Sequence, residues 1–153
     1  MNRKDYIIPS IAILCVILLL FYKPIPQDPN YHDFADKRMM AGIPNFLNVI
    51  TNLPFAIVGL LGLQVTRMIK EKELKYICAT LFIGFVLLTI RSSYFHLWPK
   101  NATLVYDRIP MVFIFMSFFA FIIYNYINKR TGYNAFIALN IIGIITCYLL
   151  DIK

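Results

Sequence analysis

Five apolar runs, separated by short polar breaks, constrain the fold of this chain more than any other feature of its sequence. They cover residues 6–22, 43–66, 74–97, 109–127 and 133–150. A helix needs about 20 apolar residues to cross the roughly 30 Å hydrocarbon core of a bilayer, and each run approaches that length. The runs therefore predict an all-α polytopic membrane helix bundle with about five transmembrane helices, in a single domain over residues 1–153.

The composition agrees with a membrane protein, since 59% of the residues are hydrophobic and 15% are charged. A soluble domain carries about 25% charged residues. The formal net charge is +7, but the cations stand in the breaks between apolar runs, without a basic stripe of interleaved aromatic residues. We therefore exclude nucleic acid as a partner. The cysteines lie inside apolar runs and form no C-x-x-C pattern, which supports neither a zinc knuckle nor a redox motif.

The lysines and arginines beside the apolar runs predict the orientation of the chain. Arg3 and Lys4 precede the first run, and a dense group of cations occupies residues 67–75. Both groups favour the cytoplasmic side, so we expect the N-terminus inside. No small-x-small cleavage site follows the first run, which predicts an uncleaved anchor helix. Residues 23–42, the longest polar stretch, then form an extracytoplasmic loop.

Polar groups at membrane depth are candidates for function because their burial in hydrocarbon is unfavourable. Ser92 and His96 are four residues apart and share one helix face, and Asp107 follows where the next helix is expected to begin. Two antiparallel helices joined by a short loop bring these three side chains to one depth. A hydroxyl, an imidazole and a carboxylate together can bind a metal or perform acid–base chemistry.

Each of these residues also has a structural explanation. Ser92 can bond to a carbonyl of its own helix, and His96 can belong to an interfacial aromatic belt beside Trp98. Asp107 can be the N-cap of a helix that begins at about Ile109. A lone histidine at a helix end is weak evidence by itself, so both explanations stay open.

Two further polar groups are candidates. Asn45, Asn48 and Asn52 recur at i, i+3 and i+7, so one helix face would point three amides into the bundle. They would either form hydrogen bonds between helices or support a polar site. Asp33 and Asp36, in the polar loop, offer carboxylate oxygens of the kind that calcium prefers, although a solvated loop explains them as well.

The order of these groups resembles the alkaline ceramidase family, part of a wider superfamily of seven-helix membrane hydrolases. The resemblance rests on residues 45–52 (NFLNVITN), on the S-x-x-x-H pattern of Ser92 and His96, and on the D-x-x-P-M pattern that starts at Asp107. The bacterial branch has an additional N-terminal helix, which residues 6–22 would match. The resemblance thus implies a multi-pass protein of the bacterial inner membrane.

The resemblance also implies an activity. Members of the family are zinc-dependent amidases that hydrolyse ceramide, so the implied substrate is ceramide or another N-acyl lipid, cleaved by zinc-activated water. His96 would be a zinc ligand, and Ser92 would stabilise the oxyanion or contact the metal-bound water. Asp107 would orient or deprotonate that water. Asp33 and Asp36 would be the candidate calcium ligands.

The chain departs from the family pattern at its zinc site and at its calcium site. The family completes its zinc site with an H-x-x-x-H pair on its last helix, whereas His32 and His96 are the two histidines here. Catalytic zinc normally takes three protein ligands, so we expect a truncated hydrolase that is inactive alone, or one completed by a homo-oligomer or a partner chain. The family also has an acidic residue where Asn45 stands, which weakens the calcium prediction.

Three other functions stay open at this point. A non-enzymatic lipid-binding or receptor-like bundle would bind lipid without turnover. A small transporter subunit would use the asparagine face to line a polar path. A membrane scaffold that assembles with another subunit would depend on none of these polar side chains.

Overall fold

The computed structural model describes residues 4–21 and 27–151. Three features of the sequence argument lie outside the described residues. These are Arg3, the end of the first apolar run at Tyr22, and the beginning of the polar loop at residues 23–26.

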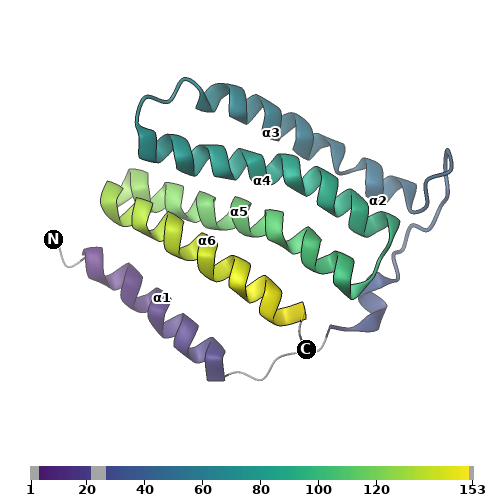
Figure 1. Cartoon of the computed structure of the whole chain (residues 1–153), viewed down its shortest axis with the longest axis horizontal. Coiled ribbons are helices and arrows are strands. Elements are labelled where there is room, and N and C mark those ends of the chain that lie inside the picture. Colours follow the sequence, from purple (N-terminus) through teal and green to yellow (C-terminus); the bar gives the residue numbers. More distant parts are fainter. Residues whose placement is uncertain (1–3, 22–26, 152–153) are drawn as a thin grey trace.

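The described residues form helices joined by loops (Figure 1). In chain order they are α1 (Lys4–Phe21), the 3-10 turn η1 (Pro29–His32), α2 (Phe46–Ile50), α3 (Leu53–Thr66), α4 (Lys72–Leu97), α5 (Asn101–Tyr126) and α6 (Lys129–Asp151). Within the described ranges there is no strand, and β-type pairing is limited to a bridge between Met40 and Ile43. The predicted all-α class is therefore confirmed.

Four helical segments of the described chain are long and apolar enough to cross a bilayer. They are Phe46–Thr66, which joins α2 and α3, Lys72–Leu97, Asn101–Tyr126 and Lys129–Tyr148, with mean hydropathies between 1.3 and 1.9. They match the second to fifth predicted runs, so the prediction of a polytopic membrane bundle is confirmed. The first run forms α1, a helix of 18 residues, whose role as a fifth crossing stays a prediction.

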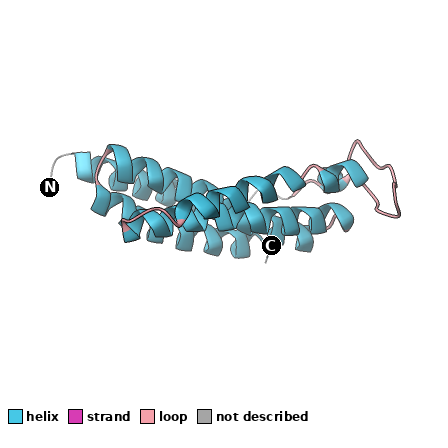
Figure 2. Cartoon of the chain, turned by 90° about the horizontal axis from the view of Figure 1, so that it is seen from above, coloured by secondary structure: helices cyan, strands magenta, loops and turns pink. Residues whose placement is uncertain are grey.

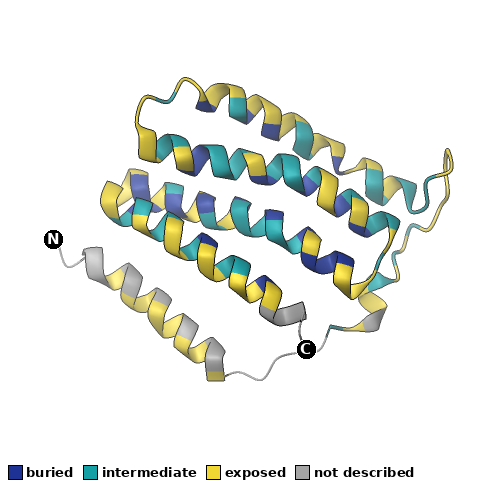
Figure 3. Ribbon diagram, viewed as in Figure 1, coloured by how far each residue is buried: buried dark blue, intermediate teal, exposed yellow. Residues whose placement is uncertain are grey.

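Helices α3, α4, α5 and α6 lie side by side in chain order and form one layer (Figures 1 and 2). Each packs against the next, and α4 and α6 touch only slightly across α5. Large apolar side chains, among them Ile57, Leu60 and Phe115, stay exposed on this layer. Figure 3 shows that exposed residues recur along each of its helices. Because exposed apolar surface is unfavourable in water, lipid is the solvent that suits these faces.

Close contacts at two glycines fix the register between neighbouring helices. A Cβ built on Gly84 in α4 would lie 2.9 Å from the Ile114 side chain in α5, and one on Gly143 in α6 would lie 2.5 Å from Val112. Larger side chains at these positions would push the helices apart. Small residues therefore let α5 approach both neighbours, as is common in membrane helix packing.

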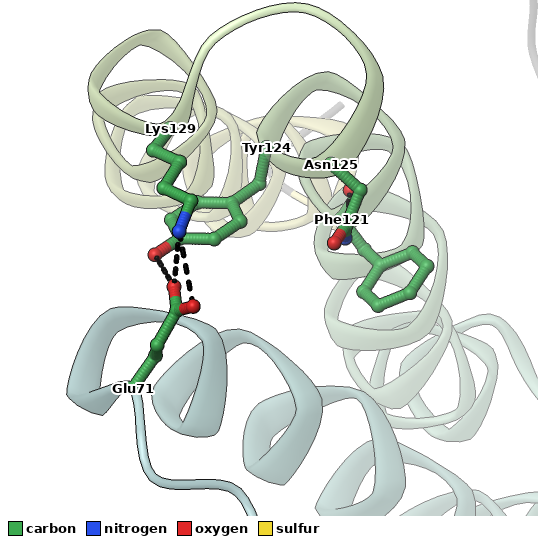
Figure 4. Close-up of polar contacts among 5 residues, drawn as sticks. All are labelled: Glu71, Phe121, Tyr124, Asn125 and Lys129. Atoms are coloured by element: carbon green, nitrogen blue, oxygen red, sulfur yellow. Dashed lines mark hydrogen bonds and ion pairs between the residues drawn. The ribbon is translucent and has the colours of Figure 1, made fainter.

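A polar cluster joins the helices at the end of the layer where α4 begins (Figure 4). Tyr124 donates a hydrogen bond to the Glu71 carboxylate at 2.9 Å, and the Lys129 ammonium donates to both of its oxygens at 2.8 and 3.0 Å. The Lys129 and Tyr124 donors lower the pKa of Glu71 below its ordinary value. The cluster ties the residue before α4 to the turn between α5 and α6.

Candidate functional site

Ser92 and Asp107 meet across the contact between α4 and α5. Both are buried, with 6% and 5% of their surface exposed. Ser92 lies two turns after Gly84, and Asp107 lies two turns before Ile114, so the close contact between those residues brings the pair to one depth. The Ser92 hydroxyl lies near the carboxyl group, and the Oδ1 of that group is buried without a hydrogen-bond partner among the described residues.

Asp107 lies inside α5 and does not cap it. The helix begins at Asn101, whereas the apolar run predicted a start at residue 109. Its first turn is closed by Thr103, whose hydroxyl donates to the Trp98 carbonyl at 2.6 Å and accepts from the Lys100 amide at 3.1 Å. Hydropathy misses the first two turns because their residues are mostly polar. The capping explanation of Asp107 is therefore wrong, and its burial needs another reason.

His96 lies one turn beyond Ser92, toward the end of α4. The side chain is half-buried, and its ring centroid lies 4.8 Å from that of Phe34 in the polar loop. Its Nδ1 is buried and has no hydrogen-bond partner within the described chain. A neutral imidazole carries one acceptor nitrogen, so His96 can offer this atom to a metal or a substrate.

The three asparagines do not share one continuous helix. Asn45 precedes α2 and has a left-handed φ of 50°. The helix is interrupted between α2 and α3. Pro54 explains the break, because it has no N–H to bond to the Ile50 carbonyl. The side-chain amides of Asn45 and Asn48 donate to the His96 and Asp36 carbonyls, at 2.8 and 3.0 Å, and that of Asn52 donates to Asn48 at 3.0 Å. They therefore fasten the loop and α2 to the end of α4.

The aromatic part of this region leaves no pattern in the sequence. The rings of His32 and Phe34 both pack on Phe95, each with a centroid distance of 5.7 Å. His32 also shares a hydrogen bond of 2.7 Å between its Nε2 and the Asn101 Oδ1. The loop before α2 thus covers one end of the α4–α5 pair. Periodicity cannot find such contacts, because the loop residues follow no regular repeat.

The residues fit a zinc site only in part. His96 and Asp107 offer a buried nitrogen and a buried oxygen, which are donor types that zinc binds. Among the described residues, however, no three His, Cys, Asp or Glu side chains are close enough together to hold an ion. Catalytic zinc normally takes three protein ligands, so the set is not complete within the described part of one chain.

The predicted calcium ligands already have cationic partners. Asp33 forms an ion pair with Lys37, and Asp36 forms one with Arg38. Calcium takes about six to eight oxygen ligands, and the described loop residues contribute to no group of three ligating side chains. The residues of this loop therefore do not fit a calcium site.

Comparison with known proteins gives one match. The model of the protein family described as Ceramidase matches residues 32–153. The matched region contains Ser92, His96 and Asp107 as well as the loop residues that contact His96. No curated protein and no solved structure matches the chain.

Proposed function

Because the chain belongs to the ceramidase family, we propose that it is a membrane hydrolase that cleaves the amide bond of ceramide or another N-acyl lipid. The observation that carries the proposal is the contact between Ser92 and Asp107, a hydroxyl and a carboxyl group buried between two spanning helices. A buried carboxyl oxygen without a partner is unfavourable, and in a membrane bundle such groups commonly serve function.

The proposed reaction adds water across the amide. Asp107 accepts a proton from the attacking water through Oδ1, which is the oxygen without a partner. The water oxygen bonds to the carbonyl carbon, the C–N bond breaks, and Asp107 returns the proton to the leaving amine. Ser92 holds the carboxyl group in one orientation by hydrogen bonding. Such positioned proton transfer contributes about 10²- to 10⁴-fold to a rate.

His96 is the proposed zinc ligand of this site, since its Nδ1 is buried and free of other partners among the described residues. Bound zinc would supply a Lewis acid for the amide carbonyl and would make the attacking water more acidic. Since one chain provides fewer than the usual three ligands within its described part, we propose that a homo-oligomer or a partner chain supplies the others.

We further propose that the site faces the extracytoplasmic side of a bacterial inner membrane, with the N-terminus in the cytoplasm. The support is the distribution of positive charge. Cations gather in residues 67–75 and at Lys129 and Arg130, which lie at the opposite ends of α4 and α5 from His96 and Asp107. Cytoplasmic connections carry such an excess of lysine and arginine.

The transporter alternative finds less support than the hydrolase. The amides of Asn48 and Asn52 donate to backbone carbonyls within the loop and α2, so these donors are occupied and do not line a polar path. A bundle that binds lipid without turnover is the other candidate function, and an activity assay distinguishes it from the hydrolase.

The direct test is fatty-acid release from N-acyl lipids by the full chain in liposomes. Ceramide and a small set of other N-acyl lipids are offered with added zinc, and the products are identified by mass spectrometry. We expect release of fatty acid and free amine, with loss of activity on zinc chelation. Lipid binding without release of either product would contradict the hydrolase and support the lipid-binding bundle.

A further inference from the structure

Arg91 is an exposed arginine on a spanning helix, and it has no acidic partner among the described residues. Helix α4 has 26 residues, a length of about 39 Å, so its ends extend beyond a hydrocarbon core of roughly 30 Å. Arg91 lies about 9 Å before the end of α4 at Leu97, close to the edge of that core. The ion pairs of the described chain use Lys37, Arg38 and Lys129 instead. Because an unpaired charge at this depth is unfavourable, the guanidinium needs an anion from outside these residues.

The ring of Tyr106 in α5 holds the guanidinium of Arg91. The Arg91 Cζ lies 5.3 Å from the centroid of this ring, which is within the range of a cation–π contact. Arg38 and Arg108 donate hydrogen bonds to side chains of the chain itself, whereas Arg91 forms no such bond within the described part. A ring attracts the cation but is no strong acceptor, so the five N–H donors of the guanidinium still need oxygen atoms.

Exposed aromatic side chains surround Arg91. Tyr94 and Trp98 follow it at i+3 and i+7, so the three residues share one face at the end of α4, and the rings of Tyr94 and Trp98 are 5.0 Å apart. The exposed fractions of Tyr94, Trp98 and Tyr106 are 44%, 53% and 46%. Tyrosine and tryptophan are enriched at the level of the lipid headgroups. We call these four residues the Arg91 patch, and their composition places the patch at headgroup level.

The Arg91 patch adjoins the candidate site. Arg91 directly precedes Ser92, and Tyr106 directly precedes Asp107. Ser92 and Asp107 are buried between the helices, whereas Arg91 and Tyr106 are exposed. At this depth α4 and α5 therefore present a polar pair to each other and a cation with an aromatic ring to the surface.

We propose that the Arg91 patch binds the headgroup of an anionic phospholipid. Phosphate oxygens supply both the negative charge and the acceptors that the guanidinium lacks, in a geometry that matches its planar set of donors. The Tyr106 ring positions the cation, and the rings of Tyr94 and Trp98 contact the lipid beside it. A zwitterionic headgroup fits less well, because its amine repels the guanidinium. The proposal does not depend on whether the protein hydrolyses lipid.

The fluorescence of Trp98, the single tryptophan of the chain, tests the proposal. The full chain is reconstituted in phosphatidylcholine at 0.15 M salt, where charges more than about 8 Å apart are largely screened. Phosphatidylglycerol or phosphatidylcholine with brominated acyl chains, which quench tryptophan on contact, is then included at equal mole fractions. We expect stronger quenching by phosphatidylglycerol, because the patch gathers this lipid beside Trp98.

Variants assign the preference to the patch. Arg91→Gln should lower the preference for phosphatidylglycerol about threefold, and Arg91→Lys should keep part of it. Tyr106→Leu should lower it in the same direction, because the guanidinium loses the ring that positions it. Lys100→Gln is the matched control, since Lys100 is also exposed and lies two residues after Trp98. Its ammonium is strongly hydrated and is in cation–π contact with no ring of the described residues, so its loss should change the preference less.

Two results would overturn the proposal. Equal quenching by the two lipids in the wild type would mean that the patch does not select an anionic headgroup. An equal loss of preference in Arg91→Gln and Lys100→Gln would mean that the general positive charge at this end of the helices attracts the lipid. Phosphatidylglycerol contains no amide bond, so either result is separate from the test of the proposed hydrolysis.

Discussion

Ser92 of α4 and Asp107 of α5 are buried at one depth between two spanning helices, with the hydroxyl near the carboxyl group. Three features of the sequence produce this contact. The connection over residues 98–100 makes α4 and α5 antiparallel neighbours. Gly84 lets them approach closely, and the start of α5 at Asn101 places Asp107 inside the helix.

Replacement of Ser92 by alanine should lower kcat about tenfold and leave KM nearly unchanged, because the hydroxyl orients Asp107 and is not assigned to lipid binding. Steady-state hydrolysis of the best N-acyl lipid measures both constants. Ser117→Ala is the matched control, since this α5 hydroxyl is also fully buried but lies about 15 Å along the helix from Asp107. A rise in KM at constant kcat would instead assign Ser92 to substrate binding.

Replacement of Gly84 by alanine should destabilise the bundle by about 1–3 kcal/mol through overpacking. The new Cβ would lie 2.9 Å from the Ile114 side chain and 3.2 Å from its backbone nitrogen, so the helices must separate at the level of the site. Thermal unfolding in detergent measures the loss. Ile83→Ala, at the exposed neighbouring position, should change the midpoint less, and an unchanged midpoint for Gly84→Ala would contradict the α4–α5 register.

The long helices could be predicted because a helix that crosses a bilayer needs an apolar run of about 20 residues. Such runs are visible directly in the sequence. Helix ends with polar residues leave no such pattern. Hydropathy therefore predicts a loop for the first turns of α5, although Thr103 caps them. The arrangement of the helices in one open layer also depends on contacts that no single run specifies.

The candidate site could be predicted in part. The four-residue spacing of Ser92 and His96 and the place of Asp107 on the next helix were enough to predict that Ser92 and Asp107 lie at one depth, with His96 one turn further along α4. The prediction of one asparagine face did not include the helix interruption before Pro54. The amides of Asn45 and Asn48 instead donate to two different segments, at the His96 and Asp36 carbonyls. Phe34 could not be predicted, because its contact with His96 depends on how an irregular loop folds back.

The stability of the α4–α5–α6 end should depend on the charge of Glu71. Its pKa is lowered by Lys129 and Tyr124 from the ordinary value of 4.5, so its stabilising contribution is complete above that value and is lost as the pH falls through the lower, folded value. Glu71→Gln should therefore lower the unfolding midpoint at pH 7, and the difference from the wild type should vanish under strongly acidic conditions.

The partner of Glu71 provides the control for that measurement. Lys129→Gln should lower the midpoint at pH 7 in the same direction, and the double variant should lose less than the sum of the two single changes. Additive losses, or a difference between the wild type and Glu71→Gln that persists in acid, would contradict the assignment of this cluster as a coupled polar contact.

Zinc content should depend on His96. The purified chain is expected to hold about one zinc per chain or per dimer, and His96→Ala should lose it, because the other described residues form no group of three ligands. Elemental analysis after dialysis measures the ratio. His32→Ala tests the other histidine, whose Nδ1 is also buried without a partner among the described residues, and retention of zinc in this variant would leave His96 as the histidine ligand. Equal zinc in the wild type and His96→Ala would remove His96 from the metal site.

Hydrolysis by Asp107→Asn tests the central claim most directly. The asparagine keeps the size of the side chain but cannot accept the proton of the attacking water, so release of fatty acid in liposomes should fall by about 100-fold or more, whereas Ser117→Ala should retain the wild-type rate. Wild-type turnover that survives unchanged in Asp107→Asn would contradict the proposed site, and a wild-type chain that binds N-acyl lipid without cleaving it would contradict the proposed function.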